Sequence, residues 1–240
     1  EQPVRFAASA RAEETTAALD AGRLAYASTK KGSTMASAIV RRLDGRGPVR
    51  TFEVGPRRFG TDLLGPDTAA ERTVRRRLIT GLALRGGTLA VAGRSMTKDG
   101  SPGACGQSFI RLVSLVTGRE REVVHATCGM SGASYGPMAF DPRGRLWFVR
   151  TCGGDPSACE GRQGAPRRFD PRTGRTTLLA TRLRRVAGLA VTGSSLVVDD
   201  GPTFPSQTCQ TVSAGMAVSV CDRVQVLPAS GYTEGQPADG

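Results

Sequence analysis

Six cysteines offer the first chemistry in this sequence. They are Cys105, Cys128, Cys152, Cys159, Cys209 and Cys221. None lies in a Cys-x-x-Cys motif and the chain has a single histidine, so the spacing disfavours a zinc site. An even number of cysteines instead predicts disulfides, and with them an oxidising compartment.

Nearest-neighbour pairing joins cysteines that flank predicted turns. The three predicted disulfides are Cys105–Cys128, Cys152–Cys159 and Cys209–Cys221. The first and third pairs are nearly symmetric about turns at Gly118 and Gly215, so their members would face each other across hairpins. Each bridge would contribute roughly 2–3 kcal/mol by restricting the unfolded chain. The alternative is a set of free, buried thiols.

The other reactive residue types lack the partners that catalysis needs. His125 could serve as a general base, but one histidine beside two valines at a strand end is typical of a structural role. Asp199 and Asp200 could hold Ca²⁺ or could close a strand as turn acids. The remaining candidates are turn residues Asp141 and Asp170, and serines without a Gly-x-Ser-x-Gly context, Ser131, Ser134 and Ser213. We therefore predict no catalytic residue, no metal site and no cofactor.

Arginine dominates the charge of the chain. The formal net charge is +12, and only Lys30, Lys31 and Lys98 among the 33 basic residues are lysine. Asparagine is absent. A GC-rich coding bias produces this composition, and heat adaptation, which disfavours thermolabile residues, is the alternative. The charge by itself is therefore no proof of a binding role.

Arginine clusters nevertheless define the best candidate for ligand binding. They are Arg41-Arg42, Arg57-Arg58, Arg75-Arg76-Arg77, Arg167-Arg168 and Arg182-x-Arg184-Arg185. Arginine pairs bidentately with phosphate or carboxylate, so an anionic cell-surface polymer or an acidic protein partner fits. Aromatic content of 5% argues against specific nucleic-acid binding by stacking. Arg75, Arg76 and Arg77 form the densest cluster. The alternative is that all these arginines are solvated sheet edges.

The elements that would position these residues recur four times. Each repeat has an alternating apolar run, a turn and a second run opening on a leucine: Leu24, Leu89, Leu146 and Leu196. The approximate repeat bounds are 10–65, 78–130, 133–182 and 186–228, followed by a flexible tail at 229–240. This periodicity predicts an all-β fold, a small β-propeller of about four four-stranded blades in one domain spanning 1–240.

Two stretches fall outside the strand pattern. Ala10 to Ala18 could be a short helix or a linker. Thr68 and Glu71 have the spacing of a capping box, which favours a helical turn within 68–78.

The last repeat has no clear fourth strand, while an isolated apolar strand stands near the start of the chain. It comprises Val4, Arg5, Phe6, Ala7 and Ala8. We expect this segment to complete the last blade and close the ring, which leaves no exposed sheet edge. In the rival arrangement a partner chain supplies the missing strand and gives a homo-oligomer or filament.

The third repeat resembles a known group of propellers. GPMAFDPRGRLWFV, from Gly136, followed by RRFDPRTGRTTLL, from Arg167, is similar to blades of the NHL, streptogramin-lyase and TolB-like propellers. The resemblance implies propeller architecture. Streptogramin lyases depend on a catalytic histidine and a metal, and with His125 in a predicted strand and no second histidine, lyase chemistry is not carried over.

These observations together predict a secreted bacterial propeller that acts as a non-enzymatic binding or assembly module. Glu1-Gln-Pro reads as a mature N-terminus left after removal of a signal peptide, and no apolar run is long enough to span a bilayer. One alternative is a subunit of an extracellular filament or surface layer joined by strand exchange. The other is a propeller enzyme, lactonase-like or lyase-like, with a central metal site.

Overall fold

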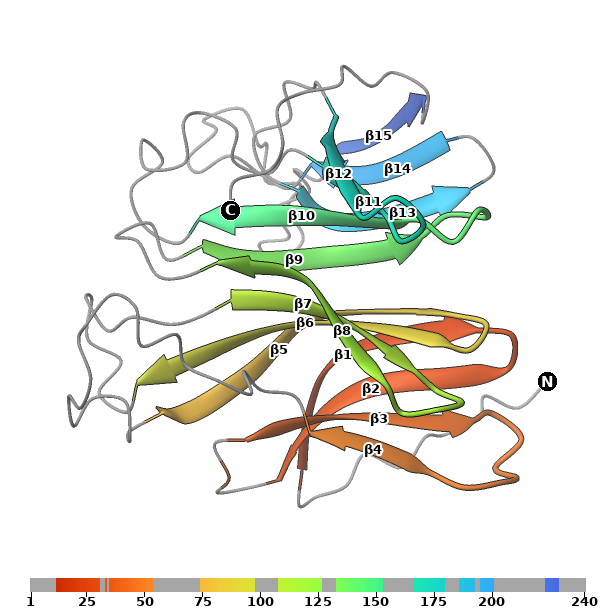
Figure 1. Ribbon diagram of the computed structural model, residues 1–240, viewed down its shortest axis with the longest axis vertical. Helices are drawn as coiled ribbons and strands as arrows, with labels where there is room; N and C mark the ends of the chain where they lie inside the picture. Colours follow the sequence, from red (N-terminus) through yellow and green to blue (C-terminus); the bar gives the residue numbers. More distant parts are fainter. Residues whose placement is uncertain are drawn as a thin grey trace, which may run out of the picture. The chain divides into compact units, whose positions relative to one another are not determined.

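The described part of the chain is built from β-strands (Figure 1). A computed structural model describes residues 12–30, 33, 35–53, 74–97, 108–126, 133–152, 166–179, 186–192, 195–200 and 223–228. Within these ranges no helix is long and apolar enough to cross a membrane. The chain divides into two compact units, Glu1–Gly132 and Ala133–Gly240.

The first unit opens with a four-stranded antiparallel meander. Its strands are β1 (Ala12–Asp20), β2 (Arg23–Lys30), β3 (Ala36–Arg42) and β4 (Arg50–Glu53), in the order β1-β2-β3-β4. The strand β1 corrects the prediction of a helix or linker over Ala10 to Ala18. Its alanines and glutamates have helical propensity, but pairing with β2 from Ala12 to Asp20 satisfies the backbone as a strand.

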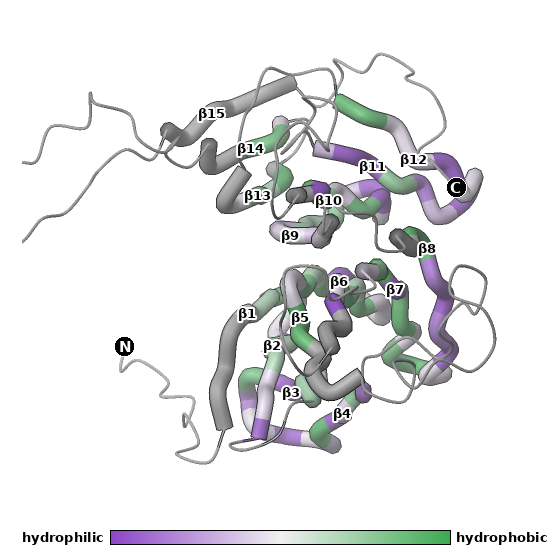
Figure 2. Tube along the Cα trace, turned by 90° about the vertical axis from the view of Figure 1, so that its left-hand side faces the viewer, coloured by the Kyte–Doolittle hydropathy of each residue, from purple (hydrophilic) through white to green (hydrophobic). Residues whose placement is uncertain are grey.

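The second sheet of this unit repeats the same plan. Its strands are β5 (Val74–Arg85), β6 (Thr88–Thr97), β7 (Ser108–Ser114) and β8 (Glu120–Ala126), in the order β5-β6-β7-β8. The helical turn expected within 68–78 is therefore wrong from Val74 onward, where β5 pairs with β6. Figure 2 shows mainly hydrophobic residues along β5 and β7 and hydrophilic ones along β8.

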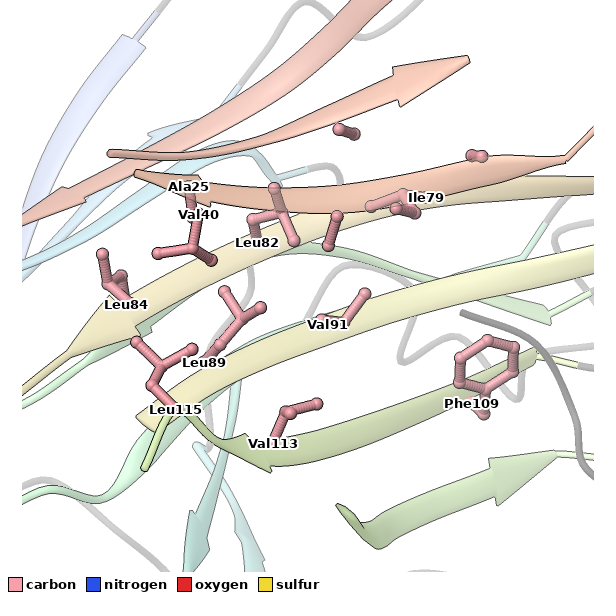
Figure 3. Packing of buried hydrophobic residues seen from close by; sticks show 13 residues of the cluster. Ala25, Val40, Ile79, Leu82, Leu84, Leu89, Val91, Phe109, Val113 and Leu115 are labelled. Carbon is pink, nitrogen blue, oxygen red and sulfur yellow. The ribbon is translucent and has the colours of Figure 1, made fainter. Parts of the chain in front are cut away.

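The core of the first unit lies between these two sheets, where β1 runs beside β5. Small residues on the first sheet, Ala25 and Ala27, belong to one buried cluster with larger ones such as Leu82 and Leu89 on the second. Figure 3 shows Ala25, Leu82 and Leu89 within this cluster. A Cβ at Gly93 would stand 2.5 Å from the Phe109 ring. Glycine at this position therefore lets the aromatic ring lie across the neighbouring strand.

The second unit contains a four-stranded and a three-stranded sheet. The first has β9 (Ala133–Phe140), β10 (Leu146–Cys152), β11 (Pro166–Asp170) and β12 (Arg175–Leu178), and the second has β13 (Val186–Thr192), β14 (Ser195–Asp200) and β15 (Arg223–Pro228). The strand β9 lies beside β13. Trp147, Val149 and Leu179 of the first sheet pack against Leu196 of the second.

Four consecutive antiparallel meanders, with the first strands of neighbouring sheets side by side in each unit, are the blades of a small β-propeller. This confirms the predicted all-β class and the four repeats. Within the described residues the last blade has three strands. Val4 to Ala8 and the tail at 229–240 lie outside the described residues, so closure of the ring stays a prediction.

Candidate anion-binding site

Several arginines already have acidic or aromatic partners within their own sheet. The Arg111 side chain is 8% exposed and lies 3.4 Å from carboxylate oxygens of both Glu120 and Glu122. Its guanidinium stands 4.9 Å from the centre of the Phe109 ring. Arg168 stands 5.8 Å from the ring of Trp147. These two arginines therefore have partners within their own sheets.

Asp141 and Asp170 are turn acids, as predicted. Asp141 is 2% exposed; its Oδ1 accepts the backbone N–H groups of Arg143 and Arg145 at 2.9 Å, and its Oδ2 accepts Arg145 Nε–H at 2.5 Å. Desolvation by burial raises the pKa of Asp141, but hydrogen bonds and charge from Arg145 outweigh it, and the net pKa is lowered. Asp170 Oδ1 likewise accepts the Arg172 N–H at 2.9 Å.

In the exposed turn after β3, an aspartate likewise accepts hydrogen bonds from an arginine side chain and from the backbone. Asp44 accepts hydrogen bonds from the guanidinium of Arg42, the shortest at 2.7 Å, and from the backbone N–H of Arg46. The hydrogen bond from Arg42 is the main reason that the pKa of Asp44 is lowered. Arg42 is therefore a turn-stabilising residue.

The cluster Arg75-Arg76-Arg77 occupies a different place. All three residues lie at the start of β5, the first strand of its sheet and the one that runs beside β1. Arg76 pairs with Met96 and Arg77 with Ser95, while Arg75 falls at a register shift. The register shift marks a β-bulge next to Arg75. Three consecutive arginine positions thus stand at the beginning of an edge strand.

Arg94 adds a fourth cation one rung further along. It lies in β6, opposite Leu78 of β5 and Ser108 of β7. Its Nε is buried and has no hydrogen-bond partner among the described residues. An unmatched buried N–H donor is unfavourable, so this position suits an acceptor brought from outside. Sequence reasoning missed Arg94; the signal is one arginine at the end of the apolar run Leu89 to Gly93.

Charges of the neighbouring sheet frame this strand end. Lys30 ends β2 opposite Ala12 at the start of β1, and β1 also carries Glu13 and Glu14. By sequence these two strands and β5 and β6 bring two acidic positions, Glu13 and Glu14, against five basic ones, Arg75, Arg76, Arg77, Arg94 and Lys30.

The remaining predicted site residues do not gather into one site. His125 lies in β8 opposite Phe109, and Asp199 lies in β14 opposite Gly188 and Val224. In the strand ladders, Asp200 lies opposite Arg223, and Ser134 lies opposite Thr151. In the described ranges, no group of three or more His, Cys, Asp or Glu residues could hold a metal ion.

Cys152 ends β10 opposite Ala133. The other five cysteines, together with Ser131 and Ser213, lie outside the described residues. The disulfide pairs and the secretion that they imply therefore stay predictions.

Comparison with known proteins finds likeness in fold only. No family model and no curated protein matches the chain. Among solved structures it is similar to a Trypanosoma rangeli sialidase, at 8% identity and a TM-score of 0.42, over 78% of this chain and 33% of the sialidase. A luciferin-regenerating enzyme has 11% identity and a TM-score of 0.45 over 95% of this chain and 64% of its own.

An ulvan lyase of a polysaccharide lyase family has 9% identity and a TM-score of 0.43, over 94% of this chain and 55% of the lyase. This chain spans a third to about two thirds of the length of these three neighbours. The sialidase and the lyase are β-propellers, and nothing in the comparison points to the NHL or TolB-like group in particular.

The prediction that the protein is not an enzyme is contradicted by this comparison. The sialidase, the luciferin-regenerating enzyme, the ulvan lyase and a Bacillus halodurans xylosidase, which matches at 13% identity and a TM-score of 0.39 over 78% of this chain and 37% of its own, are all enzymes. At such identities their activities remain statements about those proteins, and this chain keeps from them only the fold.

Proposed function

We propose that this propeller binds an anionic polymer at the basic end of β5. The observation that carries the proposal is the buried Nε of Arg94, without an acceptor among the described residues, one rung from Arg77 and two rungs from Arg76 on the paired strand. A phosphate or carboxylate oxygen would supply that acceptor, and the neighbouring guanidinium groups would neutralise its charge.

The location supports a polymer as the ligand. β5 is an edge strand of its sheet that runs beside β1, and its first residues include three consecutive arginines. Several cations along one strand end match a repeating anion better than a single small one, and each contact releases a counterion. The net charge of +12 adds a long-range attraction that increases the rate of encounter.

The first experiment compares two triple variants with the same change in charge. R75Q/R76Q/R77Q removes the cluster, and the control R143Q/R172Q/R175Q removes three exposed arginines of the second unit. Binding of fluorescently labelled linear polyphosphate and of polygalacturonate is measured by anisotropy over a range of salt. We expect the first variant to weaken binding about tenfold or more and to flatten its salt dependence, and the control to change it little.

The Arg94→Met variant tests the carrying observation directly. Methionine removes the buried N–H donor that lacks an acceptor and keeps the apolar stem of the side chain, so it should cost the fold little, whereas it removes a ligand contact. We expect an unchanged or higher melting temperature together with weaker polyanion binding. If both triple variants lost polyanion affinity equally, the binding would depend on net charge alone, and the proposal would be overturned. Preference for polyphosphate or polygalacturonate identifies the anion.

A further inference from the structure

Four hairpin turns form one edge of the first unit, and hydrogen bonds join them. The turns are 20–23, 43–49, 85–88 and 115–119, and Figure 1 shows them together at the right-hand side of this unit. Leu43 N–H donates to the Gly22 carbonyl at 2.8 Å, and Leu115 N–H donates to the Gly87 carbonyl at 2.7 Å. We call this surface, residues 19–23, 43–49, 85–88 and 115–119, the turn edge.

The first and third turns are held together through both backbone polar groups of Gly86, its N–H and its carbonyl. Asp20 Oδ2 accepts the N–H of Gly86 at 2.6 Å, and a guanidinium N–H of Arg23 donates to the Gly86 carbonyl at 2.6 Å. Because these bonds cross from one sheet to the next, the four turns keep a fixed arrangement. Side chains displayed on the turn edge are therefore presented as one surface.

Three large apolar side chains stand exposed on the turn edge. Leu19 is 64% exposed, Val49 61% and Val116 78%. The remaining large hydrophobic residue exposed in the described ranges, Met35, is 37% exposed and lies in the connection before β3. Leu19 lies at the end of β1 directly before the first turn, Val49 in the second and Val116 in the fourth, so the three come from three different segments of the turn edge.

The turn edge is also basic. Arg46 and Arg119 are exposed on it. The two acids of the same edge are already engaged, Asp44 by Arg42 and Asp20 by the Gly86 peptide. The turn edge holds four arginines, Arg23, Arg46, Arg85 and Arg119, against the two carboxylates of Asp20 and Asp44. An approaching surface therefore meets an excess of positive charge.

We propose that the turn edge docks on an anionic lipid surface. A protein partner would need a contiguous apolar centre that excludes water, whereas a bilayer interface accepts separate protruding apolar side chains. Electrostatic attraction to acidic headgroups adds to such insertion. The inference goes beyond polyanion binding at β5, because it uses other arginines at the opposite end of the strands.

Vesicle co-sedimentation of the full chain tests this inference. The probes are vesicles of phosphatidylcholine alone and of phosphatidylcholine and phosphatidylglycerol in equal parts. We expect binding to the mixed vesicles only. The variant L19S/V49S/V116S should lose about tenfold or more of this affinity, and the control M35S should bind like the wild type. Circular dichroism and the melting temperature verify that both variants are folded.

A second variant tests the contribution of charge. It also tests the inference if the triple serine variant does not fold. R46Q/R119Q should reduce binding to mixed vesicles and weaken its dependence on salt, while polyphosphate binding at β5 stays unchanged. Two results would overturn the inference: no sedimentation of the wild type with mixed vesicles at low salt, or undiminished sedimentation of both variants.

Discussion

At the scale of single residues, a buried acid decides how a turn is held. Asp141 and Asp170 follow strands in the same Asp-Pro-Arg context, yet Asp141 is 2% exposed and bound by Arg145 from backbone and side chain. Arg172 lies 3.9 Å from Asp170 and its side chain is 84% exposed. The pattern predicted both turns, but the difference between them arises from packing, which the local motif does not encode.

The Asp141→Asn variant should be less stable by about 1–3 kcal/mol at neutral pH, because the amide loses the charge and one acceptor in a buried site. The folded-state pKa of Asp141 is lowered, so its contribution to stability is present above the usual carboxyl pKa and lost as the pH falls through the lowered one. Urea unfolding should therefore show the difference between variant and wild type shrinking in acid. Asp170→Asn is the matched control, with an expected loss under about 1 kcal/mol. A loss for Asp141→Asn that is independent of pH would contradict the assignment.

At the scale of elements, strands announced by turn motifs were predicted well. The turn predicted at Gly118 lies between β7 (Ser108–Ser114) and β8 (Glu120–Ala126), as expected. β1 and the start of β5 were missed because their Ala, Glu and Arg residues favour helix locally. Pairing with β2 and β6 overrides that preference.

The candidate site was predicted in part for the same reason. A run of three arginines is visible in the sequence, but its position on an edge strand and its proximity to Arg94 depend on the register of β5 with β6. Two bulges set that register, and bulges depend on tertiary packing and strand curvature more than on residue type.

The two hydrogen bonds that Asp20 and Arg23 make to Gly86 link the first sheet to the second. D20A/R23A should speed hydrogen exchange of the Gly86 amide about tenfold or more, because Asp20 accepts that N–H and Arg23 holds the carbonyl of the same residue. Exchange is followed by mass spectrometry at peptide resolution. Asp44→Ala is the control, since it opens a turn that holds no second sheet. Unchanged protection of Gly86 in the double variant would show that the link contributes nothing.

At the scale of the whole molecule, the open question is which strand completes the last blade. In the described residues β15 pairs with β14 only, and an unpaired edge invites another strand. Val4 to Ala8 has the alternating apolar character to fill this place. If the same chain supplies it, the protein is a monomer whose stability does not depend on concentration; if a partner does, mass and stability both rise with concentration.

A proline in the middle of the predicted strand Val4 to Ala8 tests whether this segment pairs with another strand at all. Phe6→Pro removes a ladder donor and should lower the free energy of unfolding by about 2–3 kcal/mol if the segment is paired, whereas Gln2→Pro, outside the strand, should have little effect. Thermal unfolding is measured for both variants, and light scattering gives the mass of the wild type over a range of concentrations. A constant 25.1 kDa with a destabilised Phe6→Pro variant is the expected result, because intrachain pairing closes the sheet without a second molecule. A mass that doubles with concentration would assign the strand to a partner chain, and equal stability of the two proline variants would leave β15 without this segment.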